Sequence, residues 1–285
     1  MRTSILILAL LAPLIGSAQE VTEPYGFNTI TCPANSDTIV GVPFRPTGSR
    51  KGTLNALPTV DGEAATLSIA GTPGFTVNGF ANTWYAKFSS GTKNGRFYTI
   101  TANDASTLTI DLNGDNMTGV LATGTVVIAQ SWTLDSLFPP AGATTAWTGT
   151  APNTVPNGHA IVASTSTSAP LRKTQLLLPN TAGTGTNLAP NRSFYIYHNT
   201  VAATKNWLSA SGTPAAGSTI LSPDCYIIIR HPSTVPNPTT LKTTGEVETG
   251  TVSIPLSTIT TGFQDNYIAL VRPIDLTLTQ LNLYE

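Results

Sequence analysis

Residues 83–101 read TWYAKFSSGTKNGRFYTIT, and this stretch decides the fold class. From Trp84 to Phe88, successive residues alternate between the two faces that a strand presents, and aromatic side chains are prominent. The segment 89–95 (SSGTKNG) contains the Gly, Asn and Ser residues that turns require, and 96–101 (RFYTIT) is again rich in aromatic and β-branched residues. The stretch therefore predicts a β-hairpin.

Similar runs recur along the whole chain, each bounded by Gly, Pro, Asn or Ser, and no helical pattern is longer than two turns. The Asn113-Gly114 pair predicts a second hairpin, which would link 107–111 to a later strand. These patterns predict an all-β chain of antiparallel, sandwich-like or barrel-like domains. The further strands are expected at 38–44, 107–111, 126–129, 159–163, 175–178, 193–198, 226–230 and 267–271.

The composition excludes several classes of protein. Charged residues make up 10% of the 285 residues, and the net charge is −1. A chain with so few basic residues lacks the electrostatic footprint of a nucleic-acid binder. Its ample Val, Ile and Leu argue against disorder, and the scarcity of Glu and Lys argues against a helical bundle.

The first 18 residues resemble an export signal. Arg2 supplies a positive start, the apolar core 5–15 (ILILALLAPLI) follows, and small residues precede a cleavage site after Ala18. We therefore expect residues 1–18 to be a signal peptide and the mature protein to be secreted, extracellular or at the cell surface. No later run is long and apolar enough to predict membrane insertion.

Composition also divides the mature chain. Residues 19–36 predict a polar N-terminal arm, and 37–138 a first β domain. The segment 139–158, rich in Pro, Gly and Thr, predicts a linker to a second β domain at 159–285.

A weak internal repeat accompanies these strands. Thr-Leu-x-x-Leu occurs at 53–57, 133–137 and 277–281, and in each copy the Thr is placed to cap a single helical turn. In addition, 37–46 (DTIVGVPFRP) matches 265–273 (DNYIALVRP) with one residue deleted. A C-terminal strand that copies 37–46 would be able to replace that strand in a neighbouring subunit.

The stretches TCPANSDTIVGVPFRP, WYAKFSSGTKNGRFYTITANDASTLTIDLNGD and QDNYIALVRPIDLTLTQL resemble a family of secreted bacterial β-rich proteins of uncharacterised function. The resemblance covers most of the mature chain. It implies export and a β-rich fold, and it supplies no catalytic residue.

Two sets of residues are candidates for special roles. Cys32 and Cys225 form either a disulfide, which can persist outside the cytoplasm, or two buried thiols. Most aromatic side chains in the predicted strands are expected in the core. Tyr85, Tyr98 and Trp147 are the candidates for exposed rings on which a sugar stacks.

Motifs for catalysis and metal binding are weak. The run 111–116 (DLNGDN) resembles the start of a calcium loop but lacks its later ligands, and an Asn-Gly turn explains it without metal. Ser90 and Lys93 have the spacing of some acyl-enzymes but fall in a predicted turn, and His159, His198 and His231 are dispersed. We expect no enzyme, no metal site and no cofactor.

Low charge removes a usual defence of sheet edges against pairing with other chains. We therefore expect a secreted structural protein whose arm or C-terminal strand adds to a neighbour's sheet, giving a homo-oligomer or filament. The alternative is an extracellular carbohydrate-binding or adhesive module with glycan partners.

Overall fold

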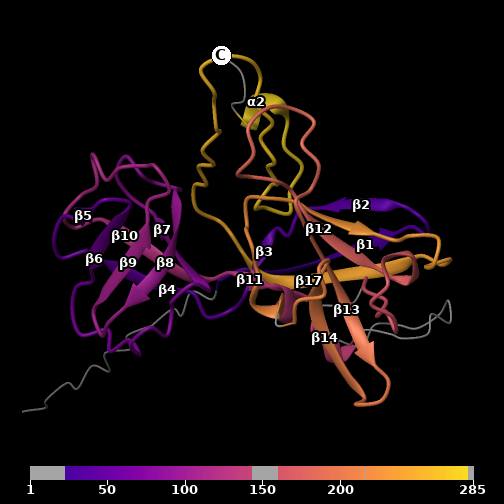
Figure 1. The fold of residues 1–285 in the computed structure, drawn as a ribbon. Helices are drawn as coiled ribbons and strands as arrows, with labels where there is room; N and C mark the ends of the chain where they lie inside the picture. Colours follow the sequence, from indigo (N-terminus) through magenta and orange to yellow (C-terminus); the bar gives the residue numbers. More distant parts are fainter. Residues whose placement is uncertain (1–22, 143–159, 215, 282–285) are drawn as a thin grey trace, which may run out of the picture.

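The computed structural model describes residues 23–142, 160–214 and 216–281, and antiparallel strands dominate it (Figure 1). The predicted all-β, sandwich-like and barrel-like fold is confirmed. The strands form two lobes with separate hydrophobic cores, seen at the left and right of Figure 1. The predicted signal peptide lies outside the described residues.

The seven-stranded lobe, residues 50–130, is built around the predicted hairpin. In it, β7 pairs with β8 so that Tyr85 is opposite Thr99 and Lys87 is opposite Phe97. Side chains on one face fill a core with members such as Phe88 and Ile100, both fully buried. The strands lie in the order β4 (Arg50–Thr53), β10 (Thr125–Gln130), β7 (Trp84–Phe88), β8 (Phe97–Asn103), β9 (Thr107–Asp111), β6 (Ala64–Ser68) and β5 (Thr59–Asp61).

The sandwich lobe contains a five-stranded and a three-stranded sheet that share one core. The first sheet has the order β14 (Thr204–Ser209), β13 (Arg192–Asn199), β12 (Gln175–Leu178), β16 (Ile227–Arg230) and β2 (Asp37–Val40). The second has the order β1 (Tyr25–Cys32), β17 (Thr239–Val247) and β3 (Phe44–Arg45). A two-stranded ladder joins β11 (Trp132–Thr133) to β15 (Ile220–Leu221), and 3₁₀ turns lie at Pro140–Gly142, Ala169–Leu171 and Ala216–Ser218.

The predicted domain limits do not coincide with these lobes. Strands β2 and β3 pair with β16 and β17, which lie about two hundred residues later in sequence. Leu134, Leu137 and Phe138 also pack in the sandwich core. The seven-stranded lobe is therefore an insertion between β3 and β11 rather than a domain spanning 37–138. Most of the predicted linker, 143–158, lies outside the described residues.

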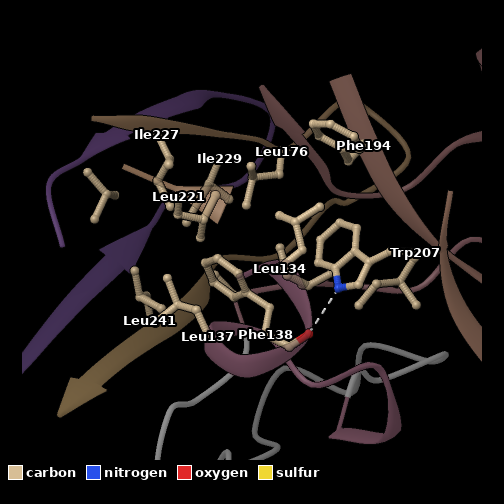
Figure 2. Close-up of a cluster of buried hydrophobic side chains, with 14 of the residues drawn as sticks. Leu134, Leu137, Phe138, Leu176, Phe194, Trp207, Leu221, Ile227, Ile229 and Leu241 are labelled. Carbon is tan, nitrogen blue, oxygen red and sulfur yellow. Dashed lines mark hydrogen bonds between the residues drawn. The ribbon is translucent and has the colours of Figure 1, made fainter. Parts of the chain in front are cut away.

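The sandwich core encloses the second copy of the Thr-Leu-x-x-Leu repeat. Thr133 caps α1 (Leu134–Leu137): its side chain accepts from the backbone N–H of Ser136, whose hydroxyl accepts in turn from the N–H of Thr133. Leu134 and Leu137 are fully buried, and the indole of Trp207 donates to the carbonyl of Phe138 at 3.1 Å (Figure 2). The capped turn that the repeat predicts therefore forms here, and its two leucines belong to the sandwich core.

The other copies of the repeat behave differently. Thr277 caps α2 (Leu278–Leu281) with Gln280 as its reciprocal partner, so this turn also forms. Thr53 instead ends β4, and Leu54 bridges to Ile69. The prediction was wrong at this copy because strand pairing satisfies the backbone groups that a helical turn would use.

Three predicted strand elements are absent. Residues 160–163, from the run expected to form a strand at 159–163, form no strand, although Ala160, Ile161 and Ala163 are buried in the sandwich core. Residues 248–277, which we call the C-terminal segment, contain neither strand nor helix, so the strand expected at 267–271 does not form. It loops out from the sandwich before ending at α2 (Figure 1). The Asn113-Gly114 turn exists, with positive φ at both residues, but β9 pairs only with β6 and β8 rather than with a strand beyond that turn.

Candidate functional site

The two cysteines form no disulfide. Cys32 is buried in the sandwich core, and Cys225 is partly buried in the loop between β15 and β16. Burial raises the pKa of both thiols, that of Cys225 to about 11. Of the two alternatives, the structure has the pair of unbridged, weakly reactive thiols.

Two of the three aromatic residues proposed for sugar stacking are buried. Tyr85 is 7% exposed and Tyr98 is 6% exposed, while Trp147 lies outside the described residues. Tyr98 packs against Phe88 in the core and donates its hydroxyl to Asp115 at 2.7 Å. Tyr85 lies on the opposite face of the sheet, where burial raises its pKa to about 12. The prediction was wrong for Tyr85 and Tyr98 because their rings pack against Phe97 and Phe88, respectively.

The calcium-like and acyl-enzyme-like motifs are structural. Asp115 accepts from Lys93 at 2.6 Å, so this carboxylate is neutralised by a lysine. The hydroxyl of Ser90 accepts from the backbone N–H of Thr125. Across the described residues, no group of three or more His, Cys, Asp or Glu side chains is arranged to hold a metal ion.

The histidines are separated. His231 is 2% exposed and lies between the hydroxyls of Thr174 and Thr239, at 3.1 and 2.7 Å. Burial lowers its pKa, so the ring is neutral near pH 7. His198 lies on β13, and His159 is outside the described residues. His198 and His231 therefore lie on or next to strands that are separated by β12 in the same sheet.

The lobes meet at a buried cluster of charges that the sequence did not reveal. Glu248 accepts from Arg45 of the sandwich lobe at 2.8 Å, and its other oxygen lies 2.6 Å from the Nζ of Lys87 in the seven-stranded lobe. Glu246 holds the same Arg45 at 2.9 Å. Lys87 is only 3% exposed, and burial lowers its pKa, while Glu248 opposes that shift. Each charge in this cluster has an opposite partner.

The start of the C-terminal segment covers the outer face of the seven-stranded sheet. The carbonyl of Thr251 accepts from Lys87 at 3.3 Å, and the N–H of Ser253 donates to the carbonyl of Gly95 at 3.0 Å. A Cβ at Gly95 would lie 2.8 Å from the backbone nitrogen of Ser253, which is too close, and the φ of Gly95 is +89°, which other residues rarely adopt. Both the close contact and the backbone conformation therefore require glycine. No pattern in the sequence links positions as distant as 95 and 253.

A second feature is the free edge of β1, at the flank of the sandwich. All eight residues of β1 pair with β17, and its other edge has no strand partner among the described residues. The strand carries no charge, and Tyr25 and Phe27 are 62% and 79% exposed. The N–H of Val247 donates to the carbonyl of Pro24. Because hydrogen bonds alternate along an antiparallel pair, the even-numbered residues of β1 face β17, and the N–H and C=O groups of its odd-numbered residues point outward. An exposed, uncharged edge of this length is a template for another strand.

This edge opens onto a groove of about 550 Å³. One wall includes Phe27 and Ile30 of β1, and a second includes Ile39 of β2. Tyr226 and most of residues 268–275 in the C-terminal segment also line the groove. Ile39 is 65% exposed, and β2 is itself the last strand of its sheet. The groove therefore lies between the outer edges of β1 and β2, which pair with no further strand in the part of the chain that the structure describes.

The helices among the described residues are single turns, too short to cross a membrane. Comparisons with protein-family models, curated proteins and solved structures found no match to this chain. The resemblance to a family of secreted bacterial proteins stays a prediction.

Proposed function

We propose that this chain is a secreted, non-catalytic structural protein whose copies assemble by adding a strand to the free edge of β1. The observation that carries the proposal is that edge: it has eight uncharged residues, the odd-numbered ones direct their backbone groups outward, and two aromatic side chains are exposed. Soluble β proteins ordinarily protect such edges with charges, prolines or bulges. Here the side-chain oxygen of Asn28 accepts from the N–H of Thr29, so this one outward N–H already has a hydrogen-bond partner.

The donor is residues 266–271 (NYIALV) of a second copy. This segment is uncharged and rich in residues that favour strands, yet it forms no strand in its own chain. It matches the pattern of 37–46, which forms β2 and β3 beside the groove. In its own chain it lies beside β2, where Gly41 leaves room for Ala269.

Release of this segment would expose a donor and widen the groove of the same molecule. Each copy would then supply a strand to one neighbour and accept a strand from another. Such a heterologous contact gives a filament when it does not close into a ring.

Light scattering and negative-stain microscopy over a concentration series test the proposal on the chain from Gln19. We expect concentration-dependent assembly, and we expect Phe27→Lys to abolish it by placing a charge on the edge. Ile268→Pro should do the same, because proline removes a backbone donor from the added strand. The matched control is Val201→Lys, at a turn residue 97% exposed, which should assemble normally.

A wild-type chain that stays monomeric at every concentration would overturn the proposal. Assembly that persists in Phe27→Lys would show that the edge of β1 is not the surface that accepts the added strand. Circular dichroism and thermal unfolding of each variant separate a blocked edge from a failure to fold.

A further inference from the structure

We propose that a cleft between the two lobes binds a small oligosaccharide. The cleft has a volume of about 460 Å³, within the usual range of about 300–1,000 Å³ for small-molecule sites. One wall comes from β8 and from the turn after β9, and the other from residues 220–224 and 253–255. It shares no lining residue with β1, so this inference is independent of strand addition.

The cleft offers an apolar surface of the kind that a sugar ring packs against. Phe97 lies on the outer face of the seven-stranded sheet, is half-buried, and is braced by Tyr85 at a ring-centroid distance of 5.8 Å. Pro223 and Pro255 line the cleft with it. The C–H face of a pyranose is apolar and flat, which matches an aromatic ring flanked by prolines.

The two walls present polar groups of opposite kind. Arg96, from the seven-stranded lobe, makes one ion pair with a described residue, a long one of 3.9 Å to Asp115, which leaves most of its guanidinium donors without a partner among the described residues. Asp224, on the opposite wall, makes no side-chain hydrogen bond or ion pair with another described residue. Burial raises the pKa of Asp224, since no cation compensates its loss of water.

Sugar hydroxyls can bond to both walls, because each hydroxyl accepts a hydrogen bond from a donor such as Arg96 and donates one to an acceptor such as Asp224. The remaining polar lining is mostly neutral and includes Ser131, Ser222 and Asn113. A polyanion such as nucleic acid would meet Asp224 and Asp111 without a matching set of cations, because Lys93 is already paired with Asp115. The chemistry of the cleft therefore selects a polyhydroxylated ligand.

An array of immobilised oligosaccharides of neutral hexoses and N-acetylhexosamines tests the inference, followed by titration of the strongest hit by saturation-transfer NMR. We expect millimolar or tighter binding, and we expect Phe97→Ala and Asp224→Asn each to weaken it about tenfold, or about 1.4 kcal/mol. Phe263→Ala is the matched control, since Phe263 is 83% exposed and does not line the cleft.

Absence of binding to every saccharide on the array would overturn the inference. Binding that is unchanged in both Phe97→Ala and Asp224→Asn would also overturn it, because the ligand would then occupy another surface. Phe27→Lys should bind like the wild type, so a failed cleft and a failed β1 edge give different results.

Discussion

At the scale of single residues, Glu248 connects the two lobes. It accepts from Arg45 on one side and from Lys87 on the other, and both cations are nearly inaccessible to water. Removing one member of such a cluster leaves a buried charge without its partner, which costs far more than losing an ion pair at the surface.

Lys87→Ala should therefore lower the free energy of unfolding by about 3 kcal/mol. Lys51→Ala should lower it by less than about 1 kcal/mol. The side chain of Lys51 is 75% exposed and pairs with Glu23 at 2.8 Å, which makes it the matched surface control. Urea unfolding of both variants measures the difference. Equal losses in the two variants would show that the buried cluster adds nothing special to stability.

Asp115 gives the protein a defined acid sensitivity. Burial raises the pKa of this carboxyl, but hydrogen bonds from Lys93, the N–H of Asn116 and Tyr98 outweigh burial and bring it from 3.8 to about 2. Because the folded pKa lies below the unfolded one, the stabilisation is present above pH 3.8 and is lost as pH falls towards 2.

Asp115→Asn should flatten the dependence of stability on pH across this window, because the amide does not titrate. Thermal unfolding at a series of pH values from 5 to 2 measures the effect in the wild type and the variant. Parallel curves for the two proteins would contradict the assignment of this acid sensitivity to Asp115.

At the scale of elements, the repeat of Thr-Leu-x-x-Leu separates what local sequence determines from what it does not. The same five-residue pattern forms a capped turn at Thr133 and at Thr277, but a strand end at Thr53. Local sequence permits the turn in all three places. Pairing of β4 with β10 decides against it at Thr53, and that pairing joins residues more than seventy positions apart.

Thr133→Ala should lower the free energy of unfolding by about 1 kcal/mol, because α1 loses its capping hydroxyl. Thr53→Ala should change it by less than about 0.5 kcal/mol, since Thr53 is an exposed strand residue. Chemical denaturation of the two variants measures both losses in the free energy of unfolding. A larger loss at Thr53 than at Thr133 would show that the cap does not matter.

The same limit explains which strands were predictable. Alternation and turn residues located β7, β8, β9, β12, β13 and β16 to within a residue or two, since these signals are local. The strand expected at 267–271 has the right composition but pairs with no strand among the described residues. A strand needs a neighbour to form its ladder, and composition does not supply one.

At the scale of the whole molecule, the sandwich is made from both ends of the described chain and the seven-stranded lobe is inserted into it. Sequence predicted two β units but placed their boundary wrongly, because contacts between β2 and β16 or β3 and β17 leave no local signature. The cluster at Glu248 and the cleft near Phe97 were missed for the same reason: each needs residues from both lobes.

The central claim is that the outer edge of β1 accepts a strand from a second copy. The most direct measurement is amide hydrogen exchange at Phe27 and Thr31 over a range of protein concentrations. We predict that exchange at both amides slows as concentration rises, while exchange at Val60 on the edge strand β5 stays constant. Exchange at Phe27 and Thr31 that stays fast while light scattering reports assembly would contradict the claim.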